Sequence, residues 1–90
     1  EDPRGILLCG SGQGMCMAAN RHRGIYASLC WDIVSAKEAR ADDNSNVLCL
    51  PARLLSDDFD KAKLIVDTWL DTSFAAAARF KRRIRQLDEL

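Results

Sequence analysis

The pattern of apolar and polar positions predicts strands and helices that alternate along the whole chain. Three short apolar runs have the length of buried strands, and each leads into a segment with helical spacing or composition. The predicted strands are 6–9, 25–30 and 46–50, and the predicted helices are 15–21, 33–41, one that follows residues 56–58, and 74–90. Strands separated by helices favour an α/β fold whose parallel sheet is joined by right-handed crossovers.

Capping residues and apolar stripes support these helices. Phe59, Ala62, Val66 and Trp69 recur at three- and four-residue spacing, which predicts an amphipathic helix packed on the sheet. Proline has no N–H group for a strand ladder, so Pro51 is expected to end the third strand. The predicted helix caps are Asp32 for the second helix, Ser56 with Asp57 and Asp58 for the third, and Thr72 or Ser73 for the last.

Length and charge limit the classes of protein. Ninety residues make one small domain, 1–90, and because the first residue is Glu1 we expect a fragment that lacks earlier strands or needs a partner. Thirteen basic and thirteen acidic residues give zero net charge, so no affinity for nucleic acid is expected. No apolar run approaches the roughly 20 residues of a membrane span, and no signal-peptide pattern is present, so we expect a cytoplasmic protein without a membrane partner.

The four cysteines predict reduced thiols and no metal. Cys9, Cys16, Cys30 and Cys49 are widely spaced, and His22 has no cysteine close to it in sequence. A zinc site needs closely paired ligands, so neither a metal nor a cofactor is expected. Three of the thiols, all except Cys9, are expected to serve as small buried hydrophobic groups.

The loop after the first strand is the strongest candidate for chemistry. Glycines alternate with other residues behind Cys9, and a helix follows, so unpaired amide groups and the positive end of the helix favour an anion here. A thiol and the hydroxyl of Ser11 lie beside these amides, which stabilise negative charge. Plain glycine-rich turns also have this pattern. The predicted anion-binding residues are Gly10, Ser11, Gly12, Gln13 and Gly14.

Residues 5–20 (GILLCGSGQGMCMAAN) resemble the signature of the ribose-5-phosphate isomerase B family, which includes the galactose-6-phosphate isomerase subunits. Residues 24–27, 46–50 and 65–70 resemble later family segments, so the likeness covers nearly the whole chain but only the rear half of the family's domain. It implies a Rossmann-like three-layer sandwich. It also implies a cofactor-free aldose–ketose isomerase of a small sugar phosphate, ribose 5-phosphate or similar, that forms a homodimer or homotetramer with sites shared between subunits.

The resemblance also implies roles for individual residues. Cys9 would be the base that forms an enediolate, with Ser11 assisting, because Met15 cannot replace the glutamate that some relatives use. Arg79 and Arg83 match an arginine pair that holds the substrate phosphate, although composition alone favours a solvated basic face.

Other positions leave alternatives open. Asn20 matches a residue near the sugar site, but it also suits a helix C-cap. Many members have a histidine that helps ring opening where Trp31 stands. Trp31 cannot transfer a proton, so another part of the protein opens the ring, the substrate is open-chain, or Trp31 stacks on a sugar face.

Further departures are Asp42 and Asp43, where family members often have His-Asn, and Phe80, where histidine often follows the first arginine. They keep open a second hypothesis, a phosphosugar-binding or regulatory subunit without activity. A nucleotide-binding Rossmann unit is a third hypothesis. It needs an acidic residue to hold a ribose, and Asp32 suits that role poorly because it caps a helix.

Overall fold

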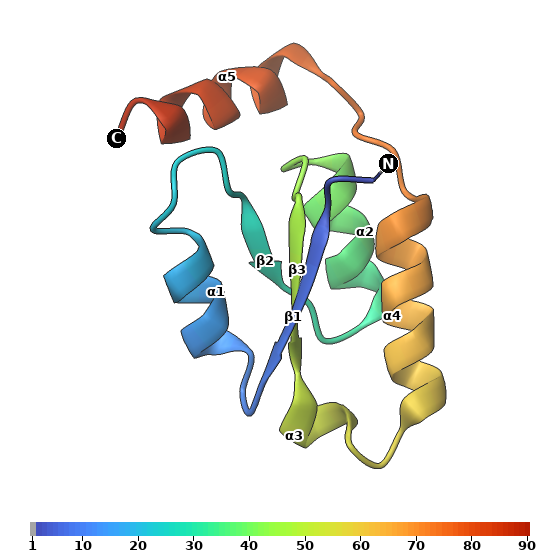
Figure 1. Ribbon diagram of the computed structural model, residues 1–90. Helices are drawn as coiled ribbons and strands as arrows, with labels where there is room; N and C mark the ends of the chain where they lie inside the picture. The colour runs from blue at the N-terminus through green and yellow to red at the C-terminus, as the bar shows by residue number, and fades with distance from the viewer. Residues whose placement is uncertain (1) are drawn as a thin grey trace.

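A computed structural model of the protein describes residues 2–90, which form three strands and five helices (Figure 1). The strands are β1 (Gly5–Cys9), β2 (Ala27–Leu29) and β3 (Val47–Pro51). The helices are α1 (Gln13–Ala19), α2 (Ile33–Ala41), α3 (Ala52–Leu55), α4 (Phe59–Asp71) and α5 (Ala78–Asp88).

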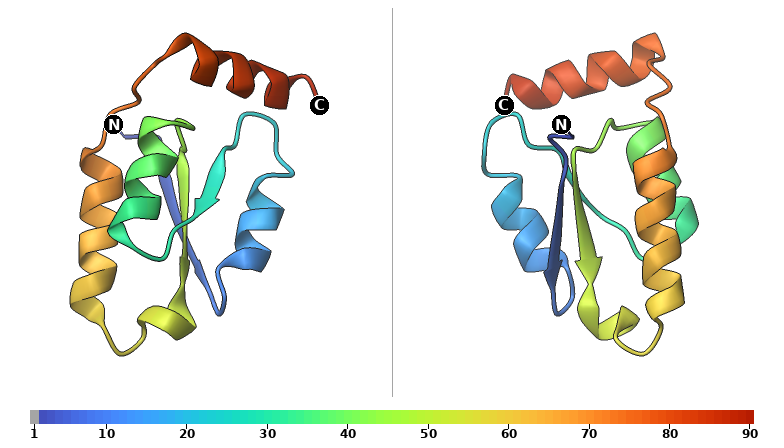
Figure 2. Two further views of the ribbon diagram at one scale, coloured as in Figure 1. Left: turned by 180° about the vertical axis from the view of Figure 1, so that it is seen from behind. Right: turned by 45° about the vertical axis from the view of Figure 1, so that its right-hand side comes forward.

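The strands form one parallel sheet in the order β1-β3-β2. Cys9 pairs with Pro51 and Leu29 with Cys49, so the carboxyl ends of all three strands meet at one edge. Helix α1 covers one face, α2 and α4 cover the other, and α5 crosses the opposite, amino-terminal edge (Figure 2). The predicted α/β class with a parallel, Rossmann-like sheet is confirmed.

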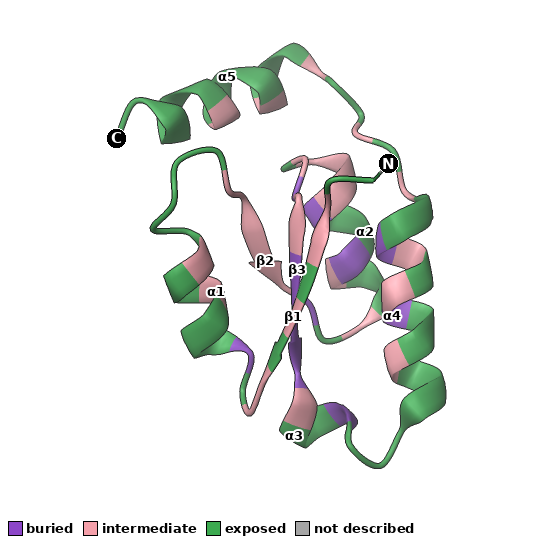
Figure 3. Cartoon of the chain, in the orientation of Figure 1, coloured by how far each residue is buried: buried purple, intermediate pink, exposed green. Residues whose placement is uncertain are grey.

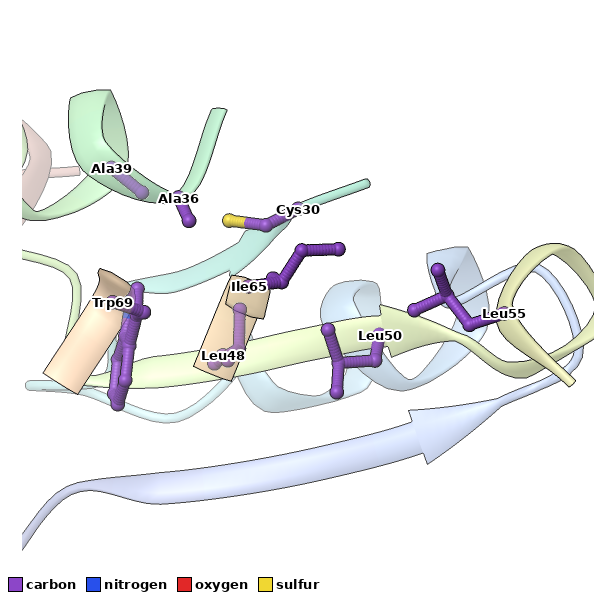
Figure 4. Packing of buried hydrophobic residues seen from close by; sticks show 8 residues of the cluster. All are labelled: Cys30, Ala36, Ala39, Leu48, Leu50, Leu55, Ile65 and Trp69. Carbon is purple, nitrogen blue, oxygen red and sulfur yellow. The ribbon is translucent and has the colours of Figure 1, made fainter. Parts of the chain in front are cut away.

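The core lies between the sheet and helices α2 and α4 (Figure 4). Leu48 of β3 and Ile65 and Trp69 of α4 have no exposed surface, which places the apolar stripe of α4 against the central strand. The Trp69 Nε1–H group donates to Ser45 Oγ at 3.3 Å, and that hydroxyl donates to the Val47 carbonyl at 3.1 Å. The buried polar atoms are thereby paired, and the indole is fixed in one orientation.

The second helix matches its prediction, whereas the segment after β3 differs. Asp32 caps α2 in a reciprocal capping box with Ser35. The short helix α3 was not predicted and uses Ser56 as its C-cap, so Asp58 alone caps α4 by accepting from the Lys61 N–H at 3.0 Å. Phe59 is 78% exposed, so its assignment to the core stripe was wrong.

The prediction for the start of the last helix was also wrong. Residues 72–77 are not helical, and Thr72 ends α4 by donating from Oγ1 to the Thr68 carbonyl at 2.6 Å instead of starting α5. Ala76 has a left-handed φ of 58°, which interrupts a continuous helix. Helix α5 begins at Ala78 without a side-chain cap and buries no residue (Figure 3).

Strand β1 has an unpaired outer edge in this structure, and apolar groups remain exposed beside it. Ile6 is 43% exposed and Leu8 62%, on the strand whose other edge pairs with β3. They line an apolar groove of about 540 Å³ with residues of β3, α3 and α4, including Leu50, Leu55 and Val66. This part of the sheet is therefore covered less completely than the side beneath α2.

Candidate active site

Gly12 fixes the shape of the loop between β1 and α1. It is buried and left-handed, with a φ of 79°, and a Cβ atom added there would lie 2.3 Å from Leu29 Cδ1. Its carbonyl accepts from the Cys16 N–H group at 3.3 Å, which starts α1 directly behind the loop. Only glycine tolerates both the conformation and the contact, so this residue brings the loop close to the carboxyl ends of β2 and β3.

The loop offers several amide groups to a ligand. Ser11 Oγ accepts from the Gln13 N–H group at 3.3 Å, so this hydroxyl is tied to the first turn of α1. Within residues 2–90, the amides of Ser11, Gly12 and Gly14 donate to no protein acceptor. Free amides at this edge of a parallel sheet are the groups that an anionic substrate oxygen needs.

Cys9 is the last residue of β1, immediately before these amides. Its thiol is free and half-buried, and its backbone is held in the sheet by pairing with Pro51. The structure thus brings the predicted base and Ser11 to the same short segment, with Gly10 between them.

Arg53 adds a positive charge that sequence reasoning missed. The backbone N–H group of Arg53 donates to the Gly10 carbonyl at 2.9 Å. A Cβ atom added to Gly10 would lie 2.7 Å from the central carbon of the Arg53 guanidinium group. The exposed side chain therefore lies directly on the loop, where a phosphate or an enediolate oxygen would be attracted. The only sequence signal was its position, two residues after the end of a strand that neighbours β1.

Trp31 and Asp32 also lie at the carboxyl-terminal edge, beyond the end of β2. Trp31 is 50% exposed, and its backbone N–H group donates to Ser35 Oγ at 3.1 Å. The carboxylate of Asp32 accepts from the Ser35 N–H at 2.7 Å, and hydrogen bonds from Ser35 hold its pKa below the usual range. Since Asp32 serves as the cap of α2, its arrangement does not favour the nucleotide-binding hypothesis.

Asn20 lies at the other end of α1, far along the strands from Cys9. It is the C-cap residue of α1, and its amide side chain makes two hydrogen bonds to the backbone of Ala27, the first residue of β2. The Nδ2–O distance is 2.9 Å and the N–Oδ1 distance is 2.8 Å. The structure therefore gives Asn20 a role in joining α1 to β2 and does not bring it to the glycine loop of its own chain.

Arg79 and Arg83 lie on α5, across the amino-terminal edge of the sheet (Figure 1). Both are exposed, and their four-residue spacing places them on neighbouring turns of one helix face. The Arg79 guanidinium lies 4.4 Å from the centre of the Phe80 ring, so the aromatic residue found in place of histidine supports that arginine. Within one chain these arginines and Cys9 are at opposite ends of the strands.

The other thiols differ from Cys9 in their surroundings. Cys30 and Cys49 have no exposed surface, and burial raises the pKa of Cys30 to about 11. Burial and the neighbouring Cys16 thiol raise the pKa of Cys49 to about 12. Cys16 is half-buried and donates to the Ala27 carbonyl at 3.3 Å. Cys30 and Cys49 are buried as expected, whereas Cys16, which was also expected to be buried, is only half-buried.

These surroundings predict a fixed order of thiol modification. In the folded protein near pH 8, we expect iodoacetamide to modify Cys9 while Cys30 and Cys49 stay unmodified, because a raised pKa and burial both suppress the reactive thiolate. Peptide mapping of the alkylated protein measures each site, and alkylation in denaturant provides the control in which all four react. Rapid modification of Cys49 in the folded protein would contradict this placement.

Residues 2–90 hold no group of three or more His, Cys, Asp or Glu side chains arranged to bind a metal ion. None of the helices described is long and apolar enough to cross a bilayer.

Comparison with known proteins shows the family to which the chain is similar. The sequence profile described as Ribose/Galactose Isomerase matches residues 1–87. D-erythrulose-4-phosphate isomerase of Pectobacterium atrosepticum is 48% identical over 71 residues, which are 79% of this chain and 45% of that protein. Ribose-5-phosphate isomerase B of Escherichia coli is 36% identical over 83 residues, which are 92% of this chain and 54% of that protein.

Solved structures show the same likeness. The crystal structure of a ribose 5-phosphate isomerase from Thermotoga maritima has a TM-score of 0.92 and 50% identity, with 98% of this chain and 59% of that chain covered. The chain spans about half the length of the curated relatives it matches. On the family profile and on relatives that match most of its length, the chain belongs to the ribose/galactose isomerase family.

Proposed function

We propose that this chain is the rear part of a sugar-phosphate isomerase that interconverts an aldose and a ketose phosphate through an enediolate. The observation that carries the proposal is the placement of Cys9 at the end of β1, directly before a loop in which the amides of Ser11, Gly12 and Gly14 donate to no acceptor among the described residues. Relatives named as isomerases of ribose 5-phosphate and of D-erythrulose 4-phosphate support this class of substrate.

In the proposed reaction, the Cys9 thiolate removes the proton from the carbon beside the substrate carbonyl. The electron pair of that C–H bond forms the enediolate, and the negative charge on oxygen is stabilised by the amides of Ser11, Gly12 and Gly14 and by Arg53. A proton moves from the hydroxyl oxygen of the neighbouring carbon to the former carbonyl oxygen, and Cys9 returns its proton to the former carbonyl carbon; these two transfers complete the isomerisation and regenerate the thiolate. The reaction needs no redox cofactor, because no net electron transfer occurs.

Phosphate binding by Arg79 and Arg83 requires a second copy of the protein. Within one chain the two arginines lie at the amino-terminal edge of the sheet, whereas Cys9 and the loop lie at the carboxyl-terminal edge. One substrate molecule cannot contact both ends of a five-residue strand, which is roughly 17 Å long. We infer a homodimer or homotetramer in which α5 of one subunit completes the site of its neighbour.

The phosphate clamp predicts unequal effects of the α5 arginines. Arg83→Ala should weaken sugar-phosphate binding by about 1.5–3 kcal/mol, which is the range for hydrogen bonds to charged groups, and Arg79→Ala should act similarly. Arg85→Ala is the matched control, because it removes the same charge from another face of α5. Titration calorimetry with the substrate measures all three variants, and equal losses would indicate a diffuse basic surface instead.

The direct test is an isomerisation assay of the whole protein with tetrose and pentose phosphates. Among the described residues, the carboxyl-terminal edge presents Trp31 but no histidine, since His22 lies near the amino-terminal edge. An open-chain substrate needs no ring-opening acid, so we expect turnover of a tetrulose 4-phosphate to be at least as fast as that of ribose 5-phosphate. Absence of turnover with every sugar phosphate would reject the isomerase proposal.

A non-catalytic phosphosugar-binding subunit is the second candidate. It is favoured by Trp31, which cannot transfer a proton, and by Asp42 and Asp43 at positions where relatives often have His-Asn. Saturable binding of sugar phosphates without turnover or proton exchange would identify this role.

A further inference from the structure

Helix α5 is held to the rest of the chain by few interactions. None of its residues is buried, and only Phe80 and Ile84 are half-buried (Figure 3). It is joined to α4 by the non-helical residues 72–77, in which the Ala75 N–H group donates to the Ala41 carbonyl at 2.9 Å. Core packing therefore does not determine where this helix lies, and polar contacts have a correspondingly larger influence.

The carboxyl end of α5 is attached to the sheet through Tyr26. The Tyr26 hydroxyl donates to the carboxylate of Asp88, the last residue of the helix, and this hydrogen bond raises the pKa of Tyr26. Tyr26 is itself firmly held, because its N–H group donates to Asn46 Oδ1 at 2.8 Å and its carbonyl accepts from the Asn46 N–H at 3.0 Å. The bond thus joins α5 to a rigid position just before β2.

A cavity lies beneath this end of α5, so side-chain packing contributes little to holding the end of the helix, and the Tyr26–Asp88 hydrogen bond is the main attachment. The cavity has a volume of about 740 Å³ and lies between the end of α5 and residues 20–28, with Asp43 also in its wall. Burial raises the pKa of Asp43, and the positive charge of Arg83 opposes that rise.

We propose that Tyr26 and Asp88 are positioning residues for the phosphate-binding arginines of α5. The inference rests on the proposed function of Arg79 and Arg83. Asp88 follows Arg83 by five residues, which is roughly 7.5 Å along the helix axis, so fixing Asp88 fixes the direction in which both guanidinium groups project.

The test compares Tyr26→Phe, Asp88→Asn and the double variant in the whole protein. Each single change should raise the KM for the sugar phosphate and the inhibition constant of inorganic phosphate by roughly 2- to 10-fold, the range expected for one hydrogen bond, with kcat unchanged. The double variant should be no worse than either single variant, because both remove the same bond. Glu89→Gln removes an adjacent exposed carboxylate and should leave both constants unchanged.

An unchanged KM in Tyr26→Phe and Asp88→Asn, a fall in kcat alone, or additive losses in the double variant would each overturn the positioning role. Both substitutions keep the size of the side chain, so folding is not expected to fail. If the wild-type protein lacks isomerase activity, the proposed function fails, and titration of wild-type and variants with inorganic phosphate still decides whether Tyr26 and Asp88 position the arginines. Equal phosphate affinity in the wild-type protein and in the variants would reject the positioning role of Tyr26 and Asp88.

Discussion

Replacement of Cys9 by alanine in the whole protein should reduce isomerisation by a factor on the order of 10²–10⁴ or more, the range expected for loss of a general base. Substrate binding should remain nearly intact. The thiolate acts in the transition state, whereas affinity for the bound sugar phosphate depends on the loop amides and arginines that the substitution leaves in place.

Exchange of the substrate C2 proton with solvent, measured together with substrate binding, tests this role of Cys9 directly. Cys16→Ala is the matched control, because Cys16 donates to the Ala27 carbonyl and lies outside the loop. That variant should lose some stability but keep the wild-type exchange rate per folded molecule. Exchange at the normal rate in Cys9→Ala would show that another group is the base.

Local sequence patterns were sufficient to predict the three strands and the position of the glycine-rich loop, although not the order of the strands in the sheet. Each predicted strand is a short apolar run, and a glycine, a proline or a polar residue follows within two positions and marks its end. The alternating glycines could be interpreted without knowledge of any distant contact. The Asp32 cap was predicted for the same reason, since both members of its capping box lie within four residues. Features that depend on neighbours in sequence are the ones that a single sequence specifies most clearly.

The features that were missed depend on contacts between distant segments. Arg53 reaches the loop only because β3 pairs with β1, and Asn20 bonds to Ala27 only because α1 ends beside the start of β2. The opposite placement of Arg79 relative to Cys9 follows from the path of residues 72–77, where helical composition predicted an earlier start of α5. Neither side-chain pairing nor this change of direction has a local signal in the sequence.

Replacement by alanine should lower the stability of the protein at Gly12 but not at Gly14, although both glycines flank Gln13. The comparison distinguishes strain at one backbone position from a general requirement for glycine in the loop. Gly12→Ala places a side chain at a φ of 79° and only 2.3 Å from Leu29 Cδ1. Strain in the left-handed conformation and overpacking together should lower the free energy of unfolding by about 2–5 kcal/mol. The amides of the loop should move with it, so sugar-phosphate affinity should also fall.

Gly14→Ala is the control, because a Cβ atom there meets nothing within 4 Å and the residue already lies in α1. This variant should be as stable as the wild type or slightly more stable, since alanine favours a helix over glycine by up to about 1 kcal/mol. Urea unfolding of both variants measures the difference. Similar stabilities for Gly12→Ala and Gly14→Ala would show that the loop can rearrange, and would remove the structural reason for assigning its amides a fixed role in the reaction.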